Sequence, residues 1–178
     1  MEQTNSKNPS NSPALSGRVA SLHLHPIEPG APLQSVEEIE LIEGKGIFGE
    51  PRYFGRISRN TGLASRRQVT LIERELIAEH AVALMVPSIP PGAVRSNIET
   101  LEINLIAWVG REVEIGEAIL RLYAARDPCA KMDAVCQGLR ELMANHRQGV
   151  LAQILRSGRV RVGDEITVRT ITGSSSTA

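Results

Sequence analysis

Cys129 has the most suggestive chemical surroundings of any residue in this chain. It lies in the run Arg126-Asp127-Pro128-Cys129-Ala130-Lys131. Asp is a preferred helix cap and Pro suits the first helical position, so the run predicts a helix from residue 128 to about residue 145. Cys129 would then lie in the first turn, where free N–H groups, the helix dipole and the charges of Arg126 and Lys131 favour a thiolate. Such a thiolate can bind a soft metal or carry sulfur.

A purely structural role for Cys129 is the alternative. Cys129 is in phase, at helical spacing, with Met132, Cys136, Leu139 and Met143, and so could equally face the core. Cys136 is expected to be a buried core residue. If both cysteines are helical, their Cα atoms are about 10 Å apart, which is too far for a disulfide.

Arginines and neighbouring polar residues form a second group that could bind a ligand. Arg56, Arg59, Arg66 and Arg67 lie close together, and a Pro-Pro-Gly loop leads to Arg95, Asn97 and Thr100. Arg suits bidentate recognition of phosphate, although a solvated loop surface is the common explanation for such a cluster. We select Arg67 and Arg95 as anion contacts, because each adjoins a predicted strand that would hold it rigidly. Asn97 and Thr100 would add hydrogen bonds.

Two further patterns carry weaker signals. Residues 43–55 contain four glycines, with G-x-G-x-x-G spacing but no βαβ unit around it, which indicates a loop that needs positive φ or close approach to a ligand. His23 and His25 alternate on one strand and could chelate a metal, but a third ligand at suitable spacing is missing. Nothing in the spacing selects His146 as the base of a cysteine hydrolase.

The composition narrows the classes of partner. Formal net charge is zero and aromatic residues make up 3% of the 178 residues, so neither a basic field nor stacking platforms for nucleic acid are expected. No apolar run is long enough for a membrane span, and the N-terminus lacks a secretory signal. We therefore expect a cytoplasmic protein with no nucleic-acid or membrane partner and with reduced cysteines.

The elements that must position these residues are mostly short strands. Apolar alternation predicts strands at 18–25, 36–42, 67–72, 111–115, 118–124, 150–155, 159–162 and 165–169, and helices at 73–86 and 128–145. Polar segments 1–16 and 171–178 are expected to be flexible tails around one domain, 17–170. Helices and strands do not alternate regularly, so a mainly β barrel is predicted over a doubly wound α/β fold.

Taken in order, the motifs resemble a MOSC domain, the module related to the C-terminal domain of molybdenum-cofactor sulfurases. The resemblance rests on residues 43–47, 52–55, 67–72, 91–92, 95–98, 110–116, 126–131 and 158–164. The chain departs from the family at Gly49-Glu50-Pro51-Arg52, where relatives often have Gly-Asp-Arg, and at Ser96. We therefore assign no role to Glu50 or Ser96.

The resemblance implies a MOSC-type β-barrel of short strands with a few helices, and a functional cysteine that matches Cys129. That cysteine would accept sulfur as a persulfide or coordinate molybdenum. Molybdenum cofactor (molybdopterin) would place its phosphate against Arg67 and Arg95, with Asn97 and Thr100, while Lys131 supports the thiolate. Pyridoxal phosphate would belong only to a separate cysteine desulfurase, because this chain has no room for that domain.

Two other functions stay open. One is a stand-alone molybdenum-cofactor reductase of N-hydroxylated compounds, which would need an electron-donor protein because two cysteines cannot hold an iron–sulfur cluster. The other is a non-catalytic anion-binding barrel in which Cys129 packs in the core. Exposed edges of a barrel also favour a homodimer.

Overall fold

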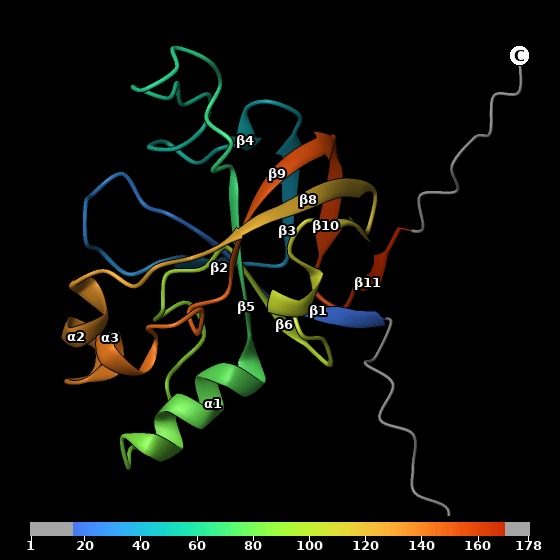
Figure 1. Ribbon diagram of the computed structural model, residues 1–178. Helices are drawn as coiled ribbons and strands as arrows, with labels where there is room; N and C mark the ends of the chain where they lie inside the picture. The colour runs from blue at the N-terminus through green and yellow to red at the C-terminus, as the bar shows by residue number, and fades with distance from the viewer. Residues whose placement is uncertain (1–15, 170–178) are drawn as a thin grey trace, which may run out of the picture.

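The computed structural model describes residues 16–169, and most of its elements are strands (Figure 1). The strands are β1 Ser16–Leu24, β2 Gln34–Val36, β3 Glu38–Ile42, β4 Gly46–Ile47, β5 Val69–Glu73, β6 Ile98–Leu101, β7 Glu112–Ile115, β8 Ala118–Ala125, β9 Val150–Arg156, β10 Gly158–Arg161 and β11 Glu165–Val168. The helices are α1 Arg74–Ala83, α2 Lys131–Val135 and α3 Leu139–Leu142, with a 3₁₀ turn, η1, at Ile106–Trp108. The expected tails 1–16 and 171–178 lie outside the described residues, apart from Ser16 at the start of β1.

Seven of the strands close into a barrel, which confirms the predicted fold class. Their order is β11-β7-β8-β9-β5-β6-β1, and β1 pairs with β11 to complete the ring. All neighbours are antiparallel except β5 and β6, which are parallel and are joined through α1. Strand β2 pairs with β1 outside the ring, and β10-β3-β4 form a second sheet. Closure leaves β2, β4 and β10 as the edge strands among the described residues.

Apolar alternation explains why the barrel forms. Buried and partly exposed residues alternate along β7 and β9, so one face of each strand fills the interior. Leu71, Leu120 and Leu122 are completely buried there. A second, smaller core lies between α1 and the α2–α3 segment and is centred on Ile77, Met132 and Leu139. The main core therefore holds β5 and β6 rigidly, and the loops at their ends are anchored to it.

The predicted strand 36–42 is wrong in one respect, because it is two strands in two sheets. The chain bends at Glu37 and passes from β2, beside the barrel, to β3, in the three-stranded sheet. In β3, Ile39 and Leu41 alternate into the main core, which fixes the strand's register after the bend. The predicted helix 73–86 is confirmed as α1, which buries Ile77, His80 and Ala81.

The single helix predicted for residues 128–145 is also wrong. Cys136 is extended and Gly138 has φ +88, a left-handed conformation that favours glycine, so the chain forms α2 and α3 with a break between them. Asp133 Oδ1 accepts hydrogen bonds from the N–H groups of Gly138 and Arg140, both at 3.2 Å, which stabilises this break. Among residues 16–169, no helix combines the length and apolar character that crossing a bilayer requires.

Candidate functional site

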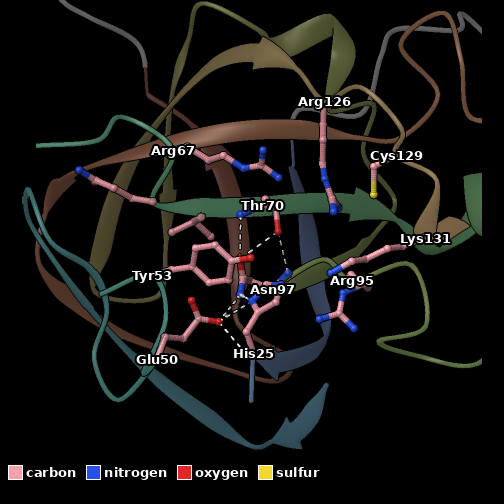
Figure 2. A pocket seen from close by; sticks show the side chains of 12 residues that line it. His25, Glu50, Tyr53, Arg67, Thr70, Arg95, Asn97, Arg126, Cys129 and Lys131 are labelled. Atoms are coloured by element: carbon pink, nitrogen blue, oxygen red, sulfur yellow. Dashed lines mark hydrogen bonds and ion pairs between the residues drawn. The ribbon is translucent and has the colours of Figure 1, made fainter. Parts of the chain in front are cut away.

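A pocket opens where the loops before β5, β6 and α2 meet the end of β1 (Figure 2). Its lining comes from five separate stretches of chain: His25, Glu50, Tyr53, Arg67, Gln68, Val69, Thr70, Arg95, Asn97, Arg126, Cys129 and Lys131. The cavity measures about 120 Å³, well below the roughly 300–1,000 Å³ of a typical small-molecule site. It therefore suits a small oxyanion, or one end of a larger ligand that extends beyond the mouth.

Positive charge dominates this lining. Arg67, Arg95, Arg126 and Lys131 face the pocket, and the only acidic lining residue is Glu50. Arg95 has φ +61, a strained conformation for a side-chain-bearing residue, and its Nη1 donates to the Ala31 carbonyl at 2.9 Å. The loop before β6 thus holds the Arg95 guanidinium in place at the expense of backbone strain.

Arg126 is the buried member of this cationic group. Its side chain is 6% exposed, its Nη1 donates to Ser96 Oγ at 2.9 Å, and its Nε has no hydrogen-bond partner among the described residues. Burial, together with the charges of Arg67 and Arg95, lowers the pKa of Arg126 to about 10, while Cys129 opposes the change. Arg126 remains protonated at neutral pH, so an anion in the pocket would relieve an uncompensated buried charge.

A hydrogen-bond network centred on Asn97 forms the floor of the pocket. Asn97 Oδ1 accepts from Thr70 N at 3.1 Å and Thr70 Oγ1 at 2.9 Å, and its Nδ2 donates to Glu50 Oε1 at 2.8 Å. The same Glu50 oxygen accepts from the His25 N–H and lies 2.8 Å from His25 Nδ1. Because Glu50 is 2% exposed, its carboxylate depends on these partners. The network fixes the relative positions of β5, the end of β1 and the start of β6.

Cys129 lies at the rim of the pocket and is exposed, beside Arg126 and Lys131 in Figure 2. It precedes the helix cap of α2, Ala130, and its carbonyl accepts the N–H of Met132 at 3.0 Å. The expected position in a first helical turn, capped by Asp127, is therefore wrong, since α2 begins at Lys131 without a side-chain cap. The alternative of a core-packed Cys129 is wrong as well. Cys136 is half-buried against the smaller core.

Comparison with known families and structures agrees with this architecture. The family model of the MOSC domain matches residues 48–167. The chain belongs to the MOSC domain family. No curated protein sequence gives a significant match.

Solved structures share the MOSC fold of this chain. YuaD from Bacillus subtilis matches with a TM-score of 0.73 and 21% identity, over 86% of this chain and 95% of that one. YiiM from Escherichia coli matches with a TM-score of 0.60 and 19% identity, over 87% and 70% of the two chains. YiiM from Geobacillus stearothermophilus matches with a TM-score of 0.63 and 14% identity, over 86% of this chain and 75% of that one. At these identities the likeness shows the fold alone.

Most of the residues selected from the sequence meet in the pocket formed by the end of β1 and the loops before β5, β6 and α2, which we call the MOSC pocket. Arg67, Arg95, Asn97, Cys129 and Lys131 all line it. Thr100 does not, because it is buried in β6 with its Oγ1 donating to the Ile72 carbonyl at 3.3 Å. Asn97 faces the pocket, but Thr70, Glu50 and the His23 carbonyl already engage its amide.

Sequence reasoning did not place Glu50, Tyr53, Gln68 or Thr70 in the site, nor the buried position of Arg126, and it considered His25 only as a possible metal ligand. The glycine-rich segment was the available signal for Glu50 and Tyr53. Gly44, Gly46, Gly49 and Gly55 all have positive φ, which confirms the loop expected there.

His23 on β1 and His25, which directly follows β1, do not converge on a common site. His23 is buried, with Nε2 lying 2.9 Å from Ser21 Oγ, whereas His25 turns to Glu50. Within residues 16–169, no three His, Cys, Asp or Glu side chains are grouped so that they could hold a metal ion.

Proposed function

We propose that the MOSC pocket binds molybdenum cofactor, with the cofactor's phosphate against the arginines and the Cys129 thiolate directed to the metal. One observation carries the proposal: an exposed cysteine shares a small pocket with Arg67, Arg95 and Arg126, while the only acidic lining residue is engaged by His25 and Asn97. Arginine suits a phosphate and thiolate suits a soft metal. The residues present therefore fit a ligand with an anionic end and a soft metal.

Each residue has a distinct part in this proposal. Arg67 and Arg95 bind the phosphate, since both are at the pocket and Arg95 is anchored through Ala31. Arg126 supplies a buried charge and an unpartnered N–H. Lys131 adds a cation beside Cys129, and the Asn97 network orients the loops. When bound, the cofactor would supply a redox-active metal centre.

Sulfur transfer is a second candidate, favoured by the exposure of Cys129. In this role the Cys129 thiolate attacks the outer sulfur of a persulfide on a cysteine desulfurase. The sulfur–sulfur bond of the donor breaks, the desulfurase thiolate leaves, and Cys129 becomes the persulfide without net oxidation. Pyridoxal phosphate stays on the desulfurase. A rim cysteine is accessible to such a donor, whereas a buried one would not be.

The loop of residues 48–66, which lies between β4 and β5 beside the pocket, supports a protein partner for either role. Its exposed apolar side chains include Phe48, Ile57 and Leu63, and Arg56 and Arg59 add positive charge. This mixture favours a partner with an acidic, partly apolar surface, such as the expected desulfurase or electron-donor protein. A cytoplasmic location belongs to the same proposal, because thiols stay reduced there.

Loading with molybdenum cofactor tests the main proposal. The purified protein is incubated with cofactor released from a molybdoenzyme, separated by gel filtration, and analysed for molybdenum and pterin. We expect stoichiometric loading of wild type and of Cys136→Ala, and loss of molybdenum from Cys129→Ala. Absence of both molybdenum and pterin from wild-type protein would overturn the proposal.

Mass spectrometry tests sulfur acceptance separately. After incubation with a cysteine desulfurase and cysteine, the peptide containing Cys129 should gain one sulfur, and the peptide should stay unmodified in Cys129→Ala. No gain on a free Cys129 would contradict the carrier role. Reduction of N-hydroxylated compounds stays a prediction of the family resemblance, and hydroxylamine turnover by loaded protein with a chemical reductant tests it.

A further inference from the structure

An acidic cleft lies at the other end of β5 from the MOSC pocket. Val69, the first residue of β5, lines the pocket, and Glu73, the last, lines the cleft. Figure 1 places α1, which follows Glu73, at the far end of the barrel from the loop that contains residues 51–66. The cleft has a volume of about 790 Å³, within the range of small-molecule sites, and its walls come from α1, the segment 102–106 and the segment 145–147.

Four glutamates give this cleft an excess of negative charge. They are Glu73, Glu75, Glu79 and Glu102. Arg147 pairs with Glu79 at 2.8 Å and Arg18 pairs with Glu102 at 3.1 Å, both as exposed ion pairs. Glu73 and Glu75 have no cationic partner among the described residues, and Glu75 Oε1 instead accepts the Glu102 N–H at 2.8 Å. The excess charge is therefore concentrated on Glu73 and Glu75.

Glu73 provides an observation that is independent of the excess charge. Its side chain is buried, with 8% exposed, and its Oε1 accepts the Leu105 N–H at 2.8 Å. Its Oε2 is buried with no hydrogen-bond donor within the described part of the chain. Burial raises the pKa of Glu73, and the charges of Glu75 and Glu79 raise it further. A buried unpaired carboxylate oxygen is costly, and a cation that donates N–H groups would relieve both the charge and the missing bond.

The backbone around the cleft is strained. Glu102, Asn145 and His146 have φ values of +65, +55 and +68, and all three line the cleft. Left-handed conformations of such residues persist where the surrounding structure holds them, and they gather at binding sites. Arg95, another strained residue, lines the MOSC pocket in the same way. The strain agrees with a second binding site but would not establish one without the unpartnered oxygen.

We propose that the cleft binds an organic cation with a primary ammonium or guanidinium group, whose N–H donors contact Glu73 and Glu75. A bare metal ion fits less well, because the described residues contain no group of three His, Cys, Asp or Glu that could hold one. The cation has two sources with the same chemistry: a free alkylamine or a lysine or arginine side chain of another protein. The site is independent of the molybdenum-cofactor proposal.

Calorimetric titration with n-butylammonium chloride tests this site at neutral pH and constant ionic strength. Tetramethylammonium, which has the charge but no N–H donors, is the control ligand. We expect saturable binding of butylammonium only. The loss of one charge-assisted hydrogen bond in Glu73→Gln or Glu75→Gln should weaken it about tenfold. Glu40→Gln, at an exposed position on β3, should bind as wild type does.

Two results would overturn the proposal: equal binding of the two cations, or wild-type affinity in Glu75→Gln. Glu75 is exposed, so Glu75→Gln keeps the test decisive if Glu73→Gln fails to fold. Titrations with putrescine and with Nα-acetyl-lysine methylamide separate the sources. Tighter binding of putrescine supports a free amine, and tighter binding of the lysine derivative supports a protein side chain.

Discussion

Arg126 connects the charge of the MOSC pocket with the stability of the fold. It is buried, adjoins Arg67, Arg95 and Cys129, and leaves Nε without a partner among residues 16–169. Arg126→Met should weaken the binding of inorganic phosphate about tenfold, because a charge-assisted bond is lost. The melting temperature should not fall, because an uncompensated buried charge is removed. Calorimetry and thermal unfolding measure the two effects.

Arg140→Met is the matched control for this prediction. Arg140 is an exposed arginine on α3 outside the pocket lining, so its loss should change neither phosphate affinity nor melting temperature. Unchanged phosphate affinity in Arg126→Met would refute the part assigned to Arg126.

Asn97 is predicted to contribute to stability more than to ligand contact. Asn97→Ala removes acceptors for two Thr70 groups and the donor to Glu50, which leaves a buried carboxylate poorly satisfied. The free energy of unfolding should fall by about 3 kcal/mol, as expected when a buried hydrogen-bonded charge loses its partner. Asn104→Ala, which removes one exposed bond to Ala107, should cost less than about 1 kcal/mol. Chemical denaturation compares them, and equal losses would contradict the prediction.

At the scale of the element, α1 contains a buried histidine that links stability to pH. Burial lowers the pKa of His80 below its ordinary value, against a raising effect of the Arg147 carbonyl, which lies 3.0 Å from Nε2. The unfolded chain therefore takes up the proton more readily, and the contribution of His80 is complete above about pH 6.5 and is lost as the pH falls below it.

Denaturation curves between pH 7.5 and pH 5 test this linkage. Glu73, whose pKa burial raises, favours the folded state as the pH falls, equally in wild type and His80→Gln. Against this background, loss of the histidine contributions should decrease the free energy of unfolding as the pH falls, and His80→Gln should make the decrease smaller. Part of it should remain, because burial also lowers the pKa of His23. An identical pH profile in wild type and His80→Gln would show that His80 does not contribute.

The elements also show how far local sequence patterns extend. Apolar alternation correctly predicts strands such as β7 and β9, because each strand needs only its own two-residue period to face the core. Helical periodicity gave a wrong prediction at residues 128–145. The apolar spacing continues past Gly138, but the helical backbone is interrupted there. Packing against α1 and the Asp133 bonds decide that break, and neither is visible in the local pattern.

At the scale of the whole molecule, the pocket depends on contacts that no local pattern records. Arg67 and Arg95 were predictable because each adjoins a strand, and the barrel fixes strand ends. Glu50 was not, because its burial depends on His25 and Asn97, which are 25 and 47 positions away in the chain. The pairing of β1 with β11 likewise joins the two ends of the described chain. Residue types thus predicted the cationic members of the pocket, and closure of the barrel determined the rest.

The surface beside the pocket leads to a prediction about the rate of partner encounter. Arg59 is exposed on the loop that borders the pocket, and charges at the rim of an interface act mainly on association rate. Arg59→Glu should therefore slow sulfur transfer from a desulfurase to Cys129 severalfold at low ionic strength, and added salt should reduce the difference by screening. Arg140→Glu changes net charge equally but lies away from this loop, so it should transfer at the wild-type rate. Equal slowing in both variants would indicate a general effect of charge, and partner docking at the loop would then be wrong.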